Sequence, residues 1–99
     1  MSTAEWLFVV DVTVAAEVEH EWNAWYDDEH LPAIAACPGV LSADRYVSDT
    51  GGGRRYLTLY ALEGPAALDT AEFRAARGWY RFTPHVQATV RLYHHRSRR

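Results

Sequence analysis

The nine residues from Glu5 to Thr13 read EWLFVVDVT, and this stretch decides how the rest of the chain is interpreted. β-Branched and aromatic residues dominate it, and it ends in an apolar–polar alternation, which is typical of a β-strand. Successive side chains of a strand point to opposite faces. One face of this strand therefore carries Trp6, Phe8, Val10 and Val12. The opposite face carries Leu7, Val9, Asp11 and Thr13.

The next stretch has the periodicity of an amphipathic helix. From Ala15 to about His30, apolar residues recur three and four positions apart, at Val18, Trp22, Trp25 and Tyr26. Thr13 is placed to cap the start of this helix. Pro32 is expected to end or restart it, which leaves 33–37 as a short extra turn before Pro38-Gly39.

The second half of the chain predicts three more strands and one more helix. Strands are expected at 40–48 and 56–62, and the glycine-rich stretch 49–53 between them favours a hairpin. Asp69 with Glu72 resembles a capping box that opens a short helix through Phe73 to Arg77, with Gly78 as its stop. An aromatic-rich loop at 79–85 then leads into a fourth strand at 86–95.

The resulting order is strand, helix, strand, strand, helix, strand. This order predicts a ferredoxin-like α+β fold, with a four-stranded antiparallel sheet and two helices on one face. At 99 residues the chain is expected to be one domain, 1–99, with its core at about 5–95 and a frayed basic tail at 96–99.

Alternation along the later strands assigns faces to the sheet. We expect the helices to cover Leu57, Leu59, Ala61, Val86, Ala88, Val90 and Leu92. The opposite face would then carry Tyr56, Thr58, Tyr60, Gln87, Thr89, Arg91 and Tyr93. A broad, partly apolar face of this kind is larger than monomers usually leave exposed. The sequence therefore predicts a homodimer through the open sheet face.

Composition excludes several classes of protein. Net charge is -3 and only the tail is basic, so a nucleic-acid partner is not expected. No apolar run approaches the roughly 18 residues of a membrane span, and no signal pattern opens the chain, so a cytoplasmic protein is expected. Cys37 is the single cysteine, which excludes an internal disulfide, and no histidine spacing indicates a metal site. No cofactor is predicted.

His30 is the first candidate for catalysis. An imidazole can accept and donate a proton near neutral pH. A position at the end of the first helix would favour its protonated form. The alternative is that His30 only caps the helix, or pairs with Asp27 or Glu29.

Asp11 is the second candidate, because a carboxylate within an apolar strand is costly unless it is hydrogen-bonded or faces a wet interior. On the open face it would lie beside Thr13, Tyr60 and Arg91 and could orient His30 or serve as its partner acid. The alternative is a strand-end carboxylate that caps the helix backbone. The expected ligand is small and apolar or aromatic, with its pocket walled by Trp22, Trp25, Tyr26 and Trp79 and an oxyanion steadied by Tyr60 with Arg45 or Arg91.

The order of elements resembles the dimeric α+β barrel superfamily. The first helix resembles its EthD-like branch in the pattern Trp22, Trp25-Tyr26, Glu29-His30, Pro32 and Pro38-Gly39. The resemblance implies a dimer whose sheets form a barrel, with a cleft between sheet and helices in each subunit. It also implies that His30 lines this cleft.

Proteins of this superfamily include polyketide cyclases, anthrone dehydratases, muconolactone isomerases and cofactor-free monooxygenases. The sequence is read first as a cofactor-independent acid–base enzyme, a cyclase, dehydratase or isomerase, acting on a small aromatic or polyketide-like substrate. The alternative is a non-catalytic ligand-binding or assembly protein of the same fold. A haem-binding or cofactor-free monooxygenase member ranks below both.

Overall fold

The computed structural model describes residues 4–99. The first half contains β1 (Trp6–Val14), η1 (Ala16–Val18), α1 (Glu19–Trp25), η2 (Tyr26–His30), α2 (Leu31–Ala35) and β2 (Val40–Ser48). The second half contains β3 (Arg55–Leu62), η3 (Pro65–Asp69), α3 (Ala71–Ala76), η4 (Tyr80–His85) and β4 (Val86–His94). All four predicted strands are therefore confirmed to within one residue at each end.

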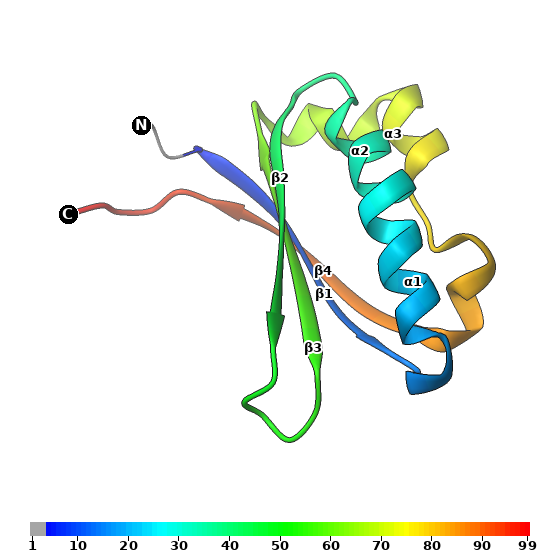
Figure 1. Cartoon of the computed structure of the whole chain (residues 1–99). Helices are drawn as coiled ribbons and strands as arrows, with labels where there is room; N and C mark the ends of the chain where they lie inside the picture. Colours follow the sequence, from blue (N-terminus) through cyan, green and yellow to red (C-terminus); the bar gives the residue numbers. More distant parts are fainter. Residues whose placement is uncertain (1–3) are drawn as a thin grey trace.

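The strands form one antiparallel sheet in the order β2-β3-β1-β4. The helices all lie on one side of this sheet, and its other face is uncovered (Figure 1). The predicted ferredoxin-like α+β fold is confirmed.

The first helical region is longer than predicted and changes its winding in the middle. Residues 16–35 are helical throughout, with a π-helical stretch at Tyr26–His30 between two α-helical ones. The wider π turn lies directly before Pro32, whose ring would clash with the carbonyl four residues earlier in a regular α-helix. Pro32 therefore does not end the helix, and His30 lies within it and not at its C-terminus.

The helix starts also differ from the prediction. Thr13 belongs to β1, and the residue before the first helical turn is Ala15, which has no capping side chain. The cap of α3 is Thr70 and not Asp69, because the Thr70 hydroxyl accepts a hydrogen bond of 3.0 Å from the Phe73 amide. Gly78 follows α3 with a φ of +107°, as expected of a C-terminal stop. The predicted loop at 79–85 is mostly the short 3-10 helix η4.

The two faces of β3 are opposite to the prediction. Tyr56, Thr58 and Tyr60 are buried under the helices, whereas Leu57, Leu59 and Ala61 lie on the uncovered face. Register explains the assignment, because Tyr60 pairs with Phe8 and Tyr56 with Val12, both on the covered face of β1. The assignments for β1 and β4 are confirmed: Phe8 pairs with Leu92 and Val10 with Val90 on the covered face.

The core lies between the sheet and the helices and is rich in aromatic side chains. Its largest fully buried members are Trp22, Tyr26, Phe82, Leu62, Val12 and Thr58. Trp22 has no exposed surface and meets Tyr26 and Tyr56 edge to face. Burial of an aromatic side chain of this size contributes about 2–3 kcal/mol by area alone, so the helical region 16–35 is held on the sheet mainly by Trp22 of α1 and Tyr26 of η2.

The Pro38-Gly39 turn brings β2 close to η3. Gly39 has a φ of +85°, and a Cβ built there would lie 2.8 Å from the Ala67 Cβ. Only glycine satisfies both the backbone conformation and the close approach. The chain can therefore leave α2 and enter β2 without separating the helical layer from the sheet.

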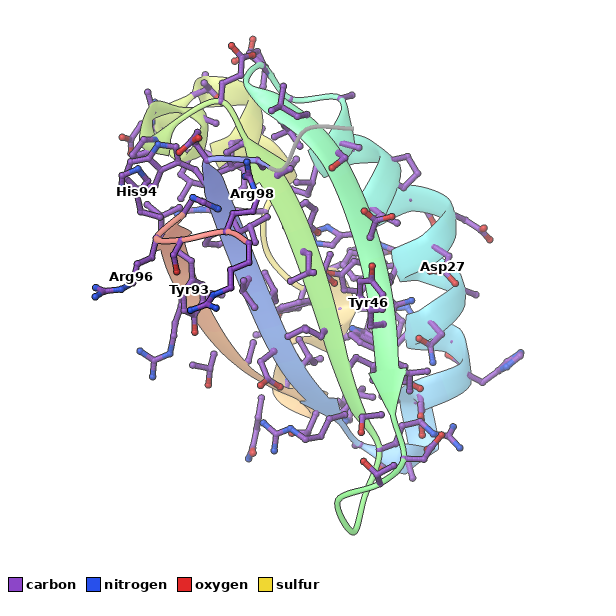
Figure 2. The ribbon with its side chains drawn as sticks, turned by 90° about the vertical axis from the view of Figure 1, so that its left-hand side faces the viewer. Asp27, Tyr46, Tyr93, His94, Arg96 and Arg98 are labelled. Carbon is purple, nitrogen blue, oxygen red and sulfur yellow. The ribbon has the colours of Figure 1, made fainter. Side chains whose placement is uncertain are left out.

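The uncovered face of the sheet is aliphatic in the middle and aromatic at its edges. Leu7, Val9, Leu57, Leu59 and Ala61 are half-buried there by their neighbours alone. Tyr46 of β2 and Tyr93 of β4 project from the two edges (Figure 2) and are 55% and 50% exposed. Dimerisation through this face stays a prediction. Every helix within residues 4–99 is too short or too polar to cross a bilayer.

Candidate functional site

A pocket of about 220 Å³ lies between the sheet, the π-helical stretch and the segment after α3. Its walls are predominantly apolar, and three groups with polar heads, Tyr26, His30 and Tyr60, face it from the helix and from β3. The remaining lining residues are Phe8, Val10, Ile34, Phe73, Arg77, Gly78, Trp79 and Val90. Val90 is 54% exposed, so the pocket opens along β4, where the helices do not reach the edge of the sheet.

His30 is held in the pocket wall by aromatic rings. Its ring stacks on Trp25 with centroids 4.7 Å apart, and meets Tyr26 edge to face at 4.9 Å. Trp79 lies on a further side at 5.6 Å. Only 7% of His30 is exposed, and within residues 4–99 its ring makes no hydrogen bond. A molecule in the pocket therefore displaces no existing hydrogen bond when it binds to the imidazole.

Burial determines the charge of His30. Removal from water, and secondarily the positive charge of Arg45, lower the pKa of His30 from 6.5 to about 4. The predicted effect of a helix C-terminus is wrong, because the helix continues for a further turn. At neutral pH the imidazole is neutral, so it can accept a proton from a bound molecule.

Three hydroxyl groups form a connected chain beside His30. The Tyr26 hydroxyl lies 2.8 Å from the Thr58 hydroxyl and 3.1 Å from the Tyr60 hydroxyl, all of them buried. Burial raises the pKa of both tyrosines, so both phenols stay protonated at neutral pH. If Thr58 donates to Tyr26 and Tyr26 to Tyr60, the Tyr60 proton is free to be donated into the pocket. Chains of this kind polarise one another and strengthen the final donor.

Arg45 does not line the pocket, although the sequence predicts that it contacts the ligand. Its guanidinium lies on the far side of Tyr26, 4.1 Å from the ring centroid, and donates to Asp27 at 2.7 Å and Asn23 at 2.8 Å. The Arg45 side chain is 12% exposed. Its charge acts on the site in two ways, by a cation–π contact with the Tyr26 ring and by lowering the pKa of His30.

Asp11 and Arg91 also lie away from the pocket. Both project from the uncovered face, since Asp11 pairs with Leu57 and Arg91 with Val9. Asp11 accepts from Arg55 at 3.0 Å. The sheet thus separates Asp11 from His30 and from Tyr60, and within one subunit Asp11 cannot orient the imidazole as predicted.

The four aromatic residues expected to wall the pocket divide into two groups. Tyr26 and Trp79 line it, as predicted. Trp22 belongs to the core behind Tyr26, and Trp25 supports His30 from the outside. The structure therefore brings together His30, Tyr26, Tyr60 and Trp79, and leaves Trp22, Trp25, Arg45, Asp11 and Arg91 outside the pocket.

Several residues of the site escape sequence reasoning. Thr58 is one of them: it does not line the pocket but its hydroxyl is hydrogen-bonded to that of Tyr26. The spacing of Tyr56, Thr58 and Tyr60 does signal three hydroxyl-bearing residues on one strand face. Arg77 and Phe73 have no such signal, because only the packing of α3 on the sheet brings them to the pocket. Among residues 4–99 no cluster of three or more metal-ligating side chains is found.

No family model and no curated protein matches the chain. Several solved structures match it in fold. One is an antibiotic biosynthesis monooxygenase, with a TM-score of 0.72, 18% identity, and coverage of 93% of this chain and 99% of that one. A Bacillus cereus protein assigned provisionally to the same class has a TM-score of 0.66, 14% identity and coverage of 98% of each chain.

A third structure is a Streptomyces coelicolor monooxygenase from the gene ActVA-Orf6, solved with nanaomycin D. Its TM-score is 0.58, at 16% identity, and the match covers 96% of this chain and 90% of that chain. At these identities the likeness establishes the fold alone, a ferredoxin-like α+β fold with a four-stranded antiparallel sheet.

The neighbours correct the functional reading of the sequence. The sequence favours a cyclase, dehydratase or isomerase and ranks a monooxygenase below these. The similar structures, however, are named as monooxygenases. The first reading is therefore wrong. That hypothesis rests on the candidate proton-transfer residues and on the family resemblance.

Proposed function

We propose that this protein is a monooxygenase that oxidises a small aromatic substrate with molecular oxygen in the pocket beside His30. The observation that carries the proposal is the neutral, hydrogen-bond-free imidazole facing an apolar pocket together with the Tyr60 hydroxyl. The names of the structural neighbours support the same class of reaction.

The chemistry requires a substrate with an acidic ring methylene whose carbanion is stabilised by a carbonyl, either adjacent to it or conjugated with it through an aromatic ring. His30 accepts one methylene proton, and the electron-rich carbanion that remains reacts with oxygen to form a carbon–oxygen bond. The resulting peroxide then loses water. One oxygen atom ends as a ring carbonyl and the other leaves as water with the two methylene hydrogens, so no external reductant is consumed.

Tyr60 supplies the second function, stabilisation of the negative charge on the substrate oxygen. In the arrangement in which Tyr26 donates to Tyr60, the Tyr60 hydroxyl is a better donor to the substrate, and Arg45 on the far face of Tyr26 polarises the chain further. Formation of an anion beside His30 also favours the imidazolium, which offsets the low pKa of the empty site.

The volume limits the substrate. A cavity of roughly 150 Å³ holds one benzene ring, so about 220 Å³ accommodates one to two fused rings. A third ring would extend toward the open side along β4. The protein is thus proposed to act on a one- or two-ring aromatic, or on a larger one that enters by its edge.

The proposal is tested with benzofuran-3-one, a two-ring probe with an acidic methylene, and anthrone, a three-ring one. Oxygen uptake would be followed with an electrode, and labelled oxygen traced by mass spectrometry into the product. We expect one labelled atom in the organic product and turnover well above the uncatalysed rate. His30→Gln should lower turnover by about 100-fold or more, the usual contribution of a positioned base.

Tyr60→Phe, which removes one hydroxyl, should lower turnover by about 10-fold or more. Tyr46→Phe removes a hydroxyl from the uncovered sheet face and should leave turnover unchanged. Absence of label in the product of both probes, or undiminished turnover in His30→Gln, would reject the proposed activity.

Three further predictions from the sequence belong to this proposal. Assignment to the EthD-like branch rests on the first-helix motif, and cytoplasmic location on composition. Homodimerisation is supported by the aliphatic centre of the uncovered face, which a second copy would bury.

A further inference from the structure

The pocket has one charged side chain in its lining, and it is positive. Arg77 reaches the pocket from the end of α3, whereas no aspartate or glutamate lines it. His30 is neutral at neutral pH, so the mouth of the pocket carries the charge of a single guanidinium.

Most other arginines outside the C-terminal strand and tail are already occupied. Arg45, Arg54, Arg55 and Arg81 form ion pairs with carboxylates, and Arg74 donates to the Asp69 carbonyl. Within residues 4–99, Arg77 makes no ion pair and no side-chain hydrogen bond. Its five donors are thus available to a ligand.

The backbone fixes Arg77 at this place. Its amide closes α3 by donating to the Phe73 carbonyl at 2.9 Å, and the next residue, Gly78, turns the chain with a φ of +107°. Trp79 then enters the pocket wall. Arg77 therefore lies at the rim between two anchored wall residues, Phe73 and Trp79, and not on a free loop.

We propose that Arg77 binds a carboxylate of the substrate, so that the pocket selects small aromatic acids. This inference rests on the proposed function and deepens it by naming the substrate class. A planar guanidinium binds a carboxylate through two parallel hydrogen bonds. With the carboxylate held at the rim, the aromatic ring enters the apolar interior in one orientation, which presents a fixed ring position to His30 and Tyr60.

The test compares two probes of equal shape, 2-naphthoate and the neutral 2-naphthamide, by calorimetric titration at pH 7.5 and low salt. We expect the wild-type protein to bind the carboxylate about ten-fold more tightly, the scale of one charge-assisted contact. In Arg77→Gln the two affinities should become equal while that for naphthamide stays unchanged. The ratio in the wild type should fall in 0.5 M salt.

Arg74→Gln is the matched control, because it removes the same charge one turn earlier on α3 without touching the pocket, and it should keep the ten-fold ratio. Unchanged naphthamide binding reports that each variant is folded. Should Arg77→Gln fail to fold, Arg77→Lys keeps the charge and should retain only part of the preference.

Equal affinities in the wild type, a ratio that survives Arg77→Gln, or no binding of either probe would overturn the proposal. Arg77-dependent binding of naphthoate without any oxygen uptake by methylene probes would retain it and reject the proposed activity. If the rate of oxygen uptake changed neither with a carboxylate on the substrate nor with replacement of Arg77, the proposed activity would be retained and carboxylate binding by Arg77 would be rejected.

Discussion

The covered and uncovered faces of the sheet bury different kinds of side chain. Under the helices, β3 presents Tyr56, Thr58 and Tyr60, whose hydroxyls are hydrogen-bonded. On the uncovered face the same strand presents Leu57, Leu59 and Ala61, between the more exposed Tyr46 and Tyr93 of the two edge strands β2 and β4 (Figure 2). The covered face thus holds the polar chemistry and the uncovered face the aliphatic surface.

A sheet face buried by the chain's own helices and a face buried by a partner therefore require different kinds of side chain. A pocket that acts on a substrate needs hydroxyl and imidazole groups held by rings, and those rings fill the space that aliphatic residues fill in an ordinary core. A contact face needs shape and apolar area, which leucine and valine supply without directional bonds. The following tests probe these two faces, in order of decreasing effect.

The largest effect is expected for Trp22→Ala, which empties the centre of the covered face. Loss of a fully buried tryptophan should lower the free energy of unfolding by about 3–5 kcal/mol. Tyr93→Ala removes a half-exposed ring from the other face and should change it by at most about 0.5 kcal/mol. Urea titration of dilute samples measures both. Comparable losses would mean that the two faces are equally important to the fold of one chain.

The second test places a charge on the uncovered face. Leu59→Lys should weaken the proposed dimer by about 100-fold or more, because a lysine would be buried without a partner charge. Sedimentation at micromolar concentration measures the dissociation constant, and naphthamide binding checks that the pocket is intact. A wild-type protein that is monomeric under these conditions would reject dimerisation through this face.

The third test uses pH. The pKa of His30 is lowered by burial from 6.5 to about 4, so the unfolded chain binds a proton that the folded one does not. The stability that the neutral imidazole contributes is fully present above about pH 6.5 and is lost as the pH falls toward 4. The free energy of unfolding should decrease by about 2–3 kcal/mol over this range. His30→Phe should abolish this part of the slope in urea midpoints, whereas His20→Gln, an exposed change on α1, should retain it.

The smallest effect compares two hydroxyls. Tyr60→Phe leaves Tyr26 bonded only to Thr58 and should lower stability by about 1 kcal/mol. Tyr46→Phe removes an exposed hydroxyl and should have an effect within about 0.5 kcal/mol. Equal values in thermal or urea unfolding would indicate that the buried hydroxyl chain contributes nothing to the fold.

Sequence alone predicts the strands, their order and the faces of β1 and β4, because periodicity and turn residues are local signals. It assigns the wrong face of β3, since hydrophobicity ranks Leu57 and Leu59 above Tyr56 and Tyr60 for burial. It also places His30 at a helix end, because Pro32 normally ends a helix and the π turn that accommodates it has no recognisable pattern. Arg77 is missed because it reaches the pocket only through tertiary packing.

The π turn at Tyr26–His30 has a consequence for how the course of this helix could change. A π turn holds one more residue than an α turn, and each residue of an α-helix advances the direction of its side chains by about 100°. Deletion of Asp28 would leave three α-helical steps of about 100° between Tyr26 and His30, so both would still lie on one side of the helix. The effect would fall on Pro32 instead, whose ring would then meet the carbonyl four residues earlier in a regular α-helix. One codon gained or lost, with no substitution at any pocket residue, would then decide whether this helix runs past Pro32 without a kink.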